Sequence, residues 1–81
     1  MADEQLSDRI ERLVAEEHEL FHRGESEHGL ADEEHKRLEA IRIELDQCWD
    51  LLRQRRALRS AGRDPETASA RSEDTVEHYL Q

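Results

Sequence analysis

The chain has 81 residues, of which 41% are charged and 4% are aromatic, and its formal net charge is −9. A chain of this length forms one small domain, and its negative charge argues against general binding to nucleic acid or to anionic membranes. The single cysteine, Cys48, excludes an internal disulfide and agrees with a reducing compartment. The N-terminal sequence MADEQLSDRI is acidic where a secretory signal is basic and then apolar, and no apolar run approaches the length of a membrane span. We therefore expect a cytoplasmic protein without a membrane segment.

Two apolar stripes run along the chain at steps of three, four and seven residues. The first consists of Leu6, Ile10, Leu13 and Leu20, and the second of Leu38, Ile41, Leu45, Cys48 and Leu52. This spacing places each set on one side of a helix, as in a coiled-coil seam. The sequence predicts an all-α fold with helices near residues 4–23 and 32–61. The short connection, residues 24–31, folds them into an antiparallel helical hairpin in which Leu13 faces Ile41.

The ends of both helices carry recognisable residues. Asp3 is our predicted N-terminal cap of the first helix, and Gly24 and Gly62 are predicted to end the two helices. Asp32 and Glu33 fall in the first turn of the second helix, where acidic groups complement the helix dipole. The predicted organisation is a hairpin over residues 1–62 followed by a C-terminal tail.

The two helices differ in length, so the end of the second is expected to extend beyond the first. This end carries large apolar side chains, namely Trp49, Leu51, Leu52 and Leu58. Either the tail, residues 63–81, covers them with Val76, Tyr79 and Leu80, or a second subunit does. Burying one such side chain contributes about 1.5–3 kcal/mol, and an isolated hairpin of this size is marginally stable. The sequence therefore predicts a homodimer, in its simplest form a four-helix bundle, with four interaction residues: Trp49, Leu52, Leu58 and Tyr79.

The segment HELFH matches the H-E-x-x-H zinc motif. It places His18 and His22 one helical turn apart, and His28 follows at the spacing of a third ligand. Zinc proteases with this motif also need a sheet, a substrate cleft and a methionine turn, whereas Met1 is the only methionine here. We expect no cofactor and no tight zinc site, and keep weak metal binding through His18, His22 and His28 as an alternative function.

Two charged clusters allow further interpretations. The basic run near the end of the second helix contains Arg53, Arg55, Arg56 and Arg59. Phosphate contacts are one reading, but we favour stabilisation of the helix end together with pairing to acidic residues of the first helix, namely Asp3, Glu4, Asp8 and Glu11. The acidic hairpin tip contains Glu25, Glu27, Asp32, Glu33 and Glu34. Helical-hairpin factors that enter the secondary channel of RNA polymerase have acidic tips, so a transcription-machinery accessory is a second alternative.

The stretch LDQCWDLLRQRRALR at residues 45–59, together with LVAEEH at residues 13–18 and the tail around Tyr79, resembles a family of small actinobacterial proteins of unknown function. The resemblance implies a short helical cytosolic protein and implies no activity. Cys48 occupies a seam position, where we expect a small buried hydrophobe and not a reactive thiol.

The narrow seams leave no room for a substrate pocket, so we expect no enzymatic activity. The sequence favours a non-enzymatic helical protein–protein interaction module that forms a homodimer and binds an unknown protein partner. The pathway and the symmetry of the dimer stay open.

Overall fold

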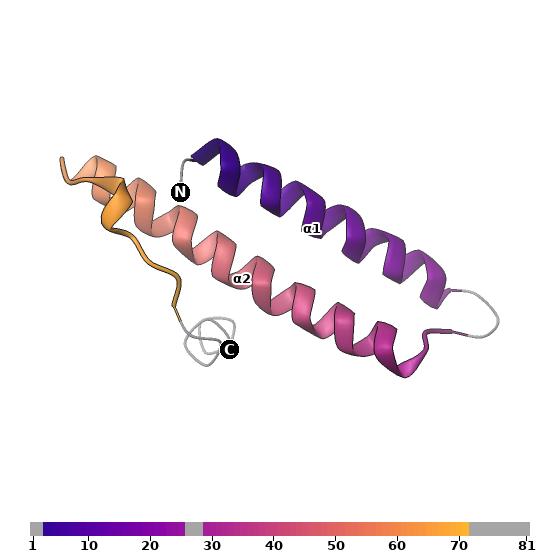
Figure 1. The fold of residues 1–81 in the computed structure, drawn as a ribbon. Helices are drawn as coiled ribbons and strands as arrows, with labels where there is room; N and C mark the ends of the chain where they lie inside the picture. The colour runs from indigo at the N-terminus through magenta and orange to yellow at the C-terminus, as the bar shows by residue number, and fades with distance from the viewer. Residues whose placement is uncertain (1–2, 26–28, 72–81) are drawn as a thin grey trace.

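A computed structural model of the chain describes residues 3–25 and 29–71. It contains the helices α1 (Asp3–Gly24) and α2 (Asp32–Ser60) and the short 3₁₀ helix η1 (Pro65–Thr67), and no strand occurs among the described residues. The helices α1 and α2 lie side by side and run in opposite directions (Figure 1). The predicted hairpin is therefore confirmed: the second helix begins at residue 32 as expected, and the other three helix ends lie one residue from their expected positions.

The core consists of the two predicted stripes. All nine of their residues are buried in one cluster: Leu6, Ile10, Leu13, Leu20, Leu38, Ile41, Leu45, Cys48 and Leu52. Leu6 and Ile41 are fully enclosed. Helical periodicity alone located this core, because a hairpin of two helices can bury only the side of each that faces the other.

The two glycines near the helix ends behave differently. Gly62 has a φ of 71°, and the backbone amide of Arg63 donates to the carbonyl of Leu58 at 2.8 Å, as in a Schellman motif. Gly62 thus ends α2 as predicted. Gly24 is still helical and has no left-handed conformation. Its missing side chain leaves space that Leu30 approaches, at 3.5 Å from the position a Cβ would take.

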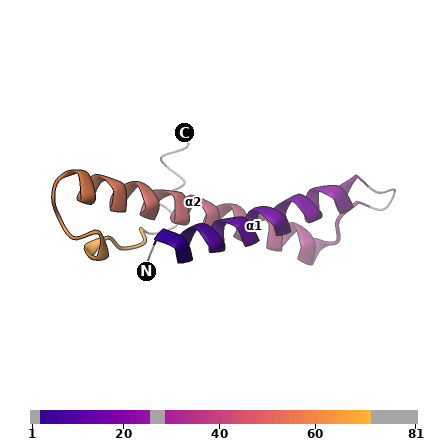
Figure 2. The ribbon, with the colours of Figure 1, turned by 90° about the horizontal axis from the view of Figure 1, so that it is seen from above.

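After α2 the chain turns and runs back along the same helix (Figures 1 and 2). We call residues 63–71 the return segment. Gln54 donates to the carbonyl of Ser69 at 2.8 Å, and Gln47 donates to the carbonyl of Arg71 at 3.2 Å. The return segment therefore packs on the hairpin's own α2. The apolar tail residues Val76, Tyr79 and Leu80 lie outside the described part of the chain.

The end of α2 is less isolated than the sequence suggested. Leu52 is 6% exposed and belongs to the hairpin core, because α1 already begins at Asp3. Leu51 is half-buried and packs against that core, and Leu58 is half-buried as well. The expectation that Leu52 lies beyond the reach of the first helix is therefore wrong.

The molecule is elongated and thin, with Cα extents of 52 × 25 × 16 Å. Figure 2 shows that α1 and α2 form a single layer. None of the described helices is long and apolar enough to cross a membrane. Among the described residues, only the return segment packs on this layer from outside the two helices.

Candidate functional site

One face of the hairpin carries exposed apolar side chains from both helices. Val14 and Phe21 are seven residues apart on α1, and Arg42 and Trp49 are seven residues apart on α2, so each pair lies two turns apart on one side of its helix. The Arg42 guanidinium lies 5.3 Å from the centre of the Phe21 ring, which places both pairs on the same face. We call this surface the aromatic face.

The apolar side chains of the aromatic face are unusually open to solvent. Val14 and Trp49 are each 44% exposed and Phe21 is 45% exposed. They are the three large hydrophobic residues that stand out as exposed in the described part of the chain. Single exposed apolar residues are common on protein surfaces, but a row of them on one face is typical of an interaction site.

The opposite flank of the hairpin is closed by ion pairs between the helices, and we call it the ion-pair face. Arg37 on α2 donates to Glu16 on α1 at 2.9 Å, and Glu44 lies 3.8 Å from Arg37 and 3.9 Å from Arg9. The hydrogen bond from Arg37 lowers the pKa of Glu16 below its ordinary value. These contacts link α1 to α2 and keep the flank polar.

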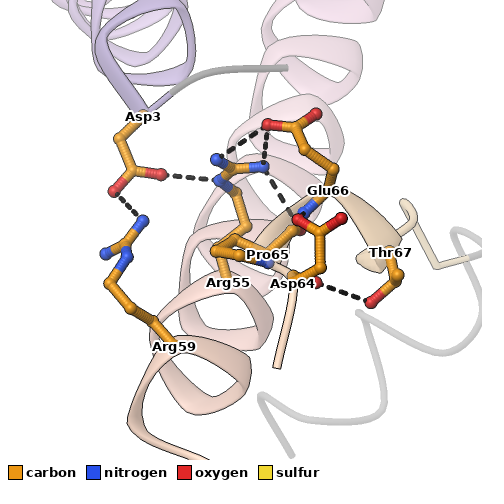
Figure 3. A network of polar contacts seen from close by, with 7 residues as sticks. All are labelled: Asp3, Arg55, Arg59, Asp64, Pro65, Glu66 and Thr67. Carbon is orange, nitrogen blue, oxygen red and sulfur yellow. Dashed lines mark hydrogen bonds and ion pairs between the residues drawn. The ribbon is translucent and has the colours of Figure 1, made fainter. Parts of the chain in front are cut away.

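The return segment is fixed to the hairpin by a cluster around Arg55 (Figure 3). The Arg55 side chain is 7% exposed and donates to Asp3 at 2.6 Å, to the carbonyl of Pro65 at 3.2 Å and to Glu66 at 3.2 Å. Arg59 donates to the second carboxylate oxygen of Asp3 at 2.7 Å. We call these four side chains, with the Pro65 carbonyl, the Arg55 clasp. It joins the start of α1, the end of α2 and the return segment.

The clasp tests two predictions: that arginines at the end of α2 pair with acidic residues of α1, and that Asp3 caps α1. Arg55 and Arg59 pair with α1 as favoured, and Asp3 is the acidic partner they use. The prediction that Asp3 caps α1 is wrong, because Asp3 is the first residue of the helix itself. Its two carboxylate oxygens accept hydrogen bonds from Arg55 and Arg59. These two hydrogen bonds, from Arg55 first and then Arg59, lower the pKa of Asp3.

The histidines do not form a metal centre in the described part of the chain. His18 and His22 are exposed on α1, and His22 lies 3.8 Å from Glu25. No group of three potential ligands that could hold a metal ion occurs among residues 3–25 and 29–71. His28, the proposed third ligand, lies outside these residues.

Two carboxylates of the acidic tip, those of Glu33 and Glu34, accept hydrogen bonds from residues close to the tip. Glu34 accepts from the backbone amide of Ala31 at 3.0 Å and from Arg23 at 3.0 Å, and Glu33 accepts from Lys36 at 3.4 Å. The amide and then Arg23 lower the pKa of Glu34. Glu27 lies outside the described residues. The contacts that are described stabilise the start of α2 and its junction with α1.

Cys48 lies beside a small cavity of about 100 Å³ near the start of α1. Its thiol is buried, and burial raises its pKa. A buried thiol with a raised pKa stays protonated at neutral pH, which agrees with the predicted role of Cys48 as a small hydrophobe.

The four predicted interaction residues lie in different environments. Trp49 is on the aromatic face, Leu52 is in the core, Leu58 is half-buried near the return segment, and Tyr79 lies outside the described residues. The sequence interpretation missed Val14 and Phe21. Their seven-residue spacing beside the seam was the available signal, and it would have shown a second apolar row next to the first.

Comparison with known proteins gives a family without an assigned function. Residues 2–81 match the family model described as "Protein of unknown function (DUF2630)". Uncharacterized proteins of Mycobacterium bovis and Mycobacterium tuberculosis are 52% identical to the chain over 79 residues, which cover 95% of this chain and 88% of each relative. No solved structure matches the chain. The resemblance to a small actinobacterial family of unknown function is thereby confirmed.

Proposed function

The chain belongs to the DUF2630 family of unknown function, and from that premise we propose that it is a non-enzymatic protein–protein interaction module. Its binding surface is the aromatic face, and the simplest occupant is a second copy of the chain. Two hairpins stacked through this face form a homodimeric four-helix bundle.

The observation that carries this proposal is the asymmetry of the hairpin. The ion-pair face and the return segment occupy one flank with polar contacts, whereas the aromatic face leaves Val14, Phe21 and Trp49 about half exposed. Aromatic residues that are open to water in one chain are the usual anchors of protein interfaces. The face is flanked by charged side chains, as the rim of an interface is.

The thinness of the molecule supports a second copy as the occupant. Stable domains usually pack two layers of secondary structure around one core, and this hairpin supplies a single layer. Residues 3–25 and 29–71 supply no third α-helix with which to build a second layer. Self-association adds that layer without any other molecule.

Sedimentation equilibrium tests the proposal. The native chain should sediment as a dimer at micromolar concentration. The double variant Val14→Gln, Trp49→Gln should sediment as a monomer with unchanged helical circular dichroism, since both side chains lie outside the buried core. Removing two interface anchors on each subunit is expected to weaken association by at least about 100-fold.

The matched control is Arg12→Gln, an exposed position of α1 that is neither in the core nor on the aromatic face. It should leave the dimer intact. A native chain that stays monomeric at several hundred micromolar would refute self-association. Leu52 is unsuited to this test, because its replacement would damage the hairpin core.

A further inference from the structure

We propose that the side of α2 under the return segment is a binding site for an extended peptide of a partner protein, and that the return segment closes this site in the free chain. The peptide carries an arginine that follows an aliphatic side chain larger than alanine. We call this surface, formed by Gln47, Asp50, Leu51 and Gln54, the covered side of α2. Trp49 is two residues from Gln47, so the aromatic face lies on nearly the opposite side of the helix, and the site does not depend on self-association.

Two glutamines of the covered side hold the return segment by its main chain. Gln47 and Gln54 are two helical turns apart, and they donate to the carbonyls of Arg71 at 3.2 Å and Ser69 at 2.8 Å. The two carbonyls are two residues apart, and the preceding Ala68 has extended backbone angles, with φ −66° and ψ 142°. Any extended peptide offers carbonyls at this spacing, so these contacts do not require the sequence of the return segment.

A buried carboxylate on the covered side selects a cation. The Asp50 side chain is 4% exposed, and its Oδ2 atom lies 3.4 Å from Nε of Arg71. The same oxygen accepts from Gln54 at 2.8 Å. A carboxylate that is taken out of water needs a charged or hydrogen-bonding partner, so a peptide bound here must supply a cation at the position of Arg71. The guanidinium of an arginine has both the charge and the donors for this pairing.

The residue before this arginine leaves space unfilled. The cavity of about 100 Å³ beside Cys48 is lined in part by Leu6 of α1, by Leu51 of α2 and by Ala70 of the return segment. Protein interiors are otherwise close-packed, and empty space forfeits the dispersion contacts of its walls. A larger aliphatic side chain at the position of Ala70 would fill part of this cavity. The return segment is therefore a weaker ligand of the covered side than a peptide with such a residue.

Attachment to the same chain allows this weaker ligand to close the site. The Arg55 clasp fixes Pro65 and Glu66, so residues 69–71 stay close to the covered side. A segment tethered in this way has an effective concentration of about 1 mM or more. A free peptide must displace it, and the apparent affinity of that peptide is reduced in proportion to the fraction of chains that are open.

Fluorescence anisotropy with a labelled synthetic peptide tests the site on the full chain. The probe is a peptide of residues 65–71 that carries Ala70→Leu. It should bind about tenfold more tightly than the same peptide with the native sequence, because the leucine fills the cavity. A peptide with Ser69→Leu is the matched control, since Ser69 does not line the cavity, and it should bind like the native peptide. Adding Arg71→Gln to the probe should weaken its binding about tenfold, because Asp50 loses its cation.

Substitutions in the chain itself should act in the opposite direction. Ala70→Leu in the full chain stabilises the closed site, so the probe should bind it about tenfold more weakly than it binds the native chain. Arg71→Glu in the full chain places a like charge beside Asp50 and opens the site, so the probe should bind about tenfold more tightly. Far-UV circular dichroism verifies that both variants keep their helices. A purely structural role of the return segment would not produce these opposite effects on a peptide in solution.

Three outcomes would overturn the proposal. The first is no saturable binding of the probe to the Arg71→Glu chain up to about 1 mM, because the site is then open and still rejects the peptide. The second is undiminished binding to an Asp50→Asn chain, which would place the peptide elsewhere on the molecule. The third is a native dimer that the probe converts to monomers in sedimentation, which would show that return segments of a second copy fill the site.

Discussion

Asp3 and Arg55 are 52 positions apart in the chain, yet their side chains meet at 2.6 Å. The sequence predicted that the arginine-rich end of the second helix would lie beside acidic residues of the first, because an antiparallel hairpin brings these ends together. It did not predict that Arg55 would be buried. Arg55 is buried where it donates to the Pro65 carbonyl and to Glu66. These residues belong to a segment without a regular repeat, so the sequence pattern could not predict its path.

The Asp3 carboxyl leads to a pH-dependent prediction. Its pKa is lowered below the ordinary value of 3.8 by Arg55 and Arg59, so the folded chain binds this proton less readily than the unfolded chain. The stabilisation is therefore fully present well above the ordinary pKa of 3.8 and is lost as the pH falls through the lower folded-state pKa. Asp3→Asn should lower the Tm by about 3–8 °C at pH 7, and this difference should shrink towards zero as the pH falls through the folded-state pKa of Asp3.

Thermal unfolding followed by circular dichroism from pH 2 to pH 7 measures this effect. Glu11→Gln makes the same change of charge on the exposed surface of α1 and is the control for net charge. A Tm difference between native chain and Asp3→Asn that persists undiminished at pH 2 would show that the clasp does not depend on the ionised carboxylate.

At the scale of the elements, the predictable part of the fold was the part with a regular repeat. The two stripes identified both helices and all nine residues of the apolar core, because these residues lie on the side of each helix that faces the other. The return segment was predictable only as a tail, since its polar contacts through Gln47 and Gln54 follow from the path of the chain. Val14 and Phe21 were overlooked because the argument for exposed apolar residues considered only the end of the second helix.

The two helix-ending glycines should respond in opposite ways to the same substitution. Gly24 has a helical backbone and room for a Cβ at ordinary contact distance from Leu30, so Gly24→Ala should stabilise the hairpin by about 0.5–1 kcal/mol. Gly62 has a φ of 71°, which costs an alanine about 1–2 kcal/mol, so Gly62→Ala should destabilise it.

Urea unfolding of the two variants at one protein concentration gives both free energies, and each variant is the control for the other. Equal effects of the two alanines would contradict the difference in backbone conformation between the two positions.

At the scale of the whole molecule, the homodimer predicted from the sequence stays a prediction, now with a different reason. From the sequence, the uncovered apolar residues were expected where α2 extends beyond the first helix. In the structure Leu52 is buried in the hairpin core, and the exposed apolar residues form a row along one face. Trp49 belongs both to this row and to the residues expected to be uncovered from the sequence. The row was hard to foresee because exposure on a hairpin depends on which side of the seam each residue lies, not only on its position along the helix.

If the second layer of the fold comes from another copy, the stability of the chain depends on its concentration. Unfolding then includes dissociation, and mass action favours the folded dimer as the protein becomes more concentrated. A hundredfold dilution of the native chain should lower its Tm by about 5–10 °C, whereas the Tm of the double variant Val14→Gln, Trp49→Gln should not change. Differential scanning fluorimetry at constant pH and salt measures both. A native Tm that is constant across this range would mean that the single layer is stable by itself, with Val14, Phe21 and Trp49 left in water.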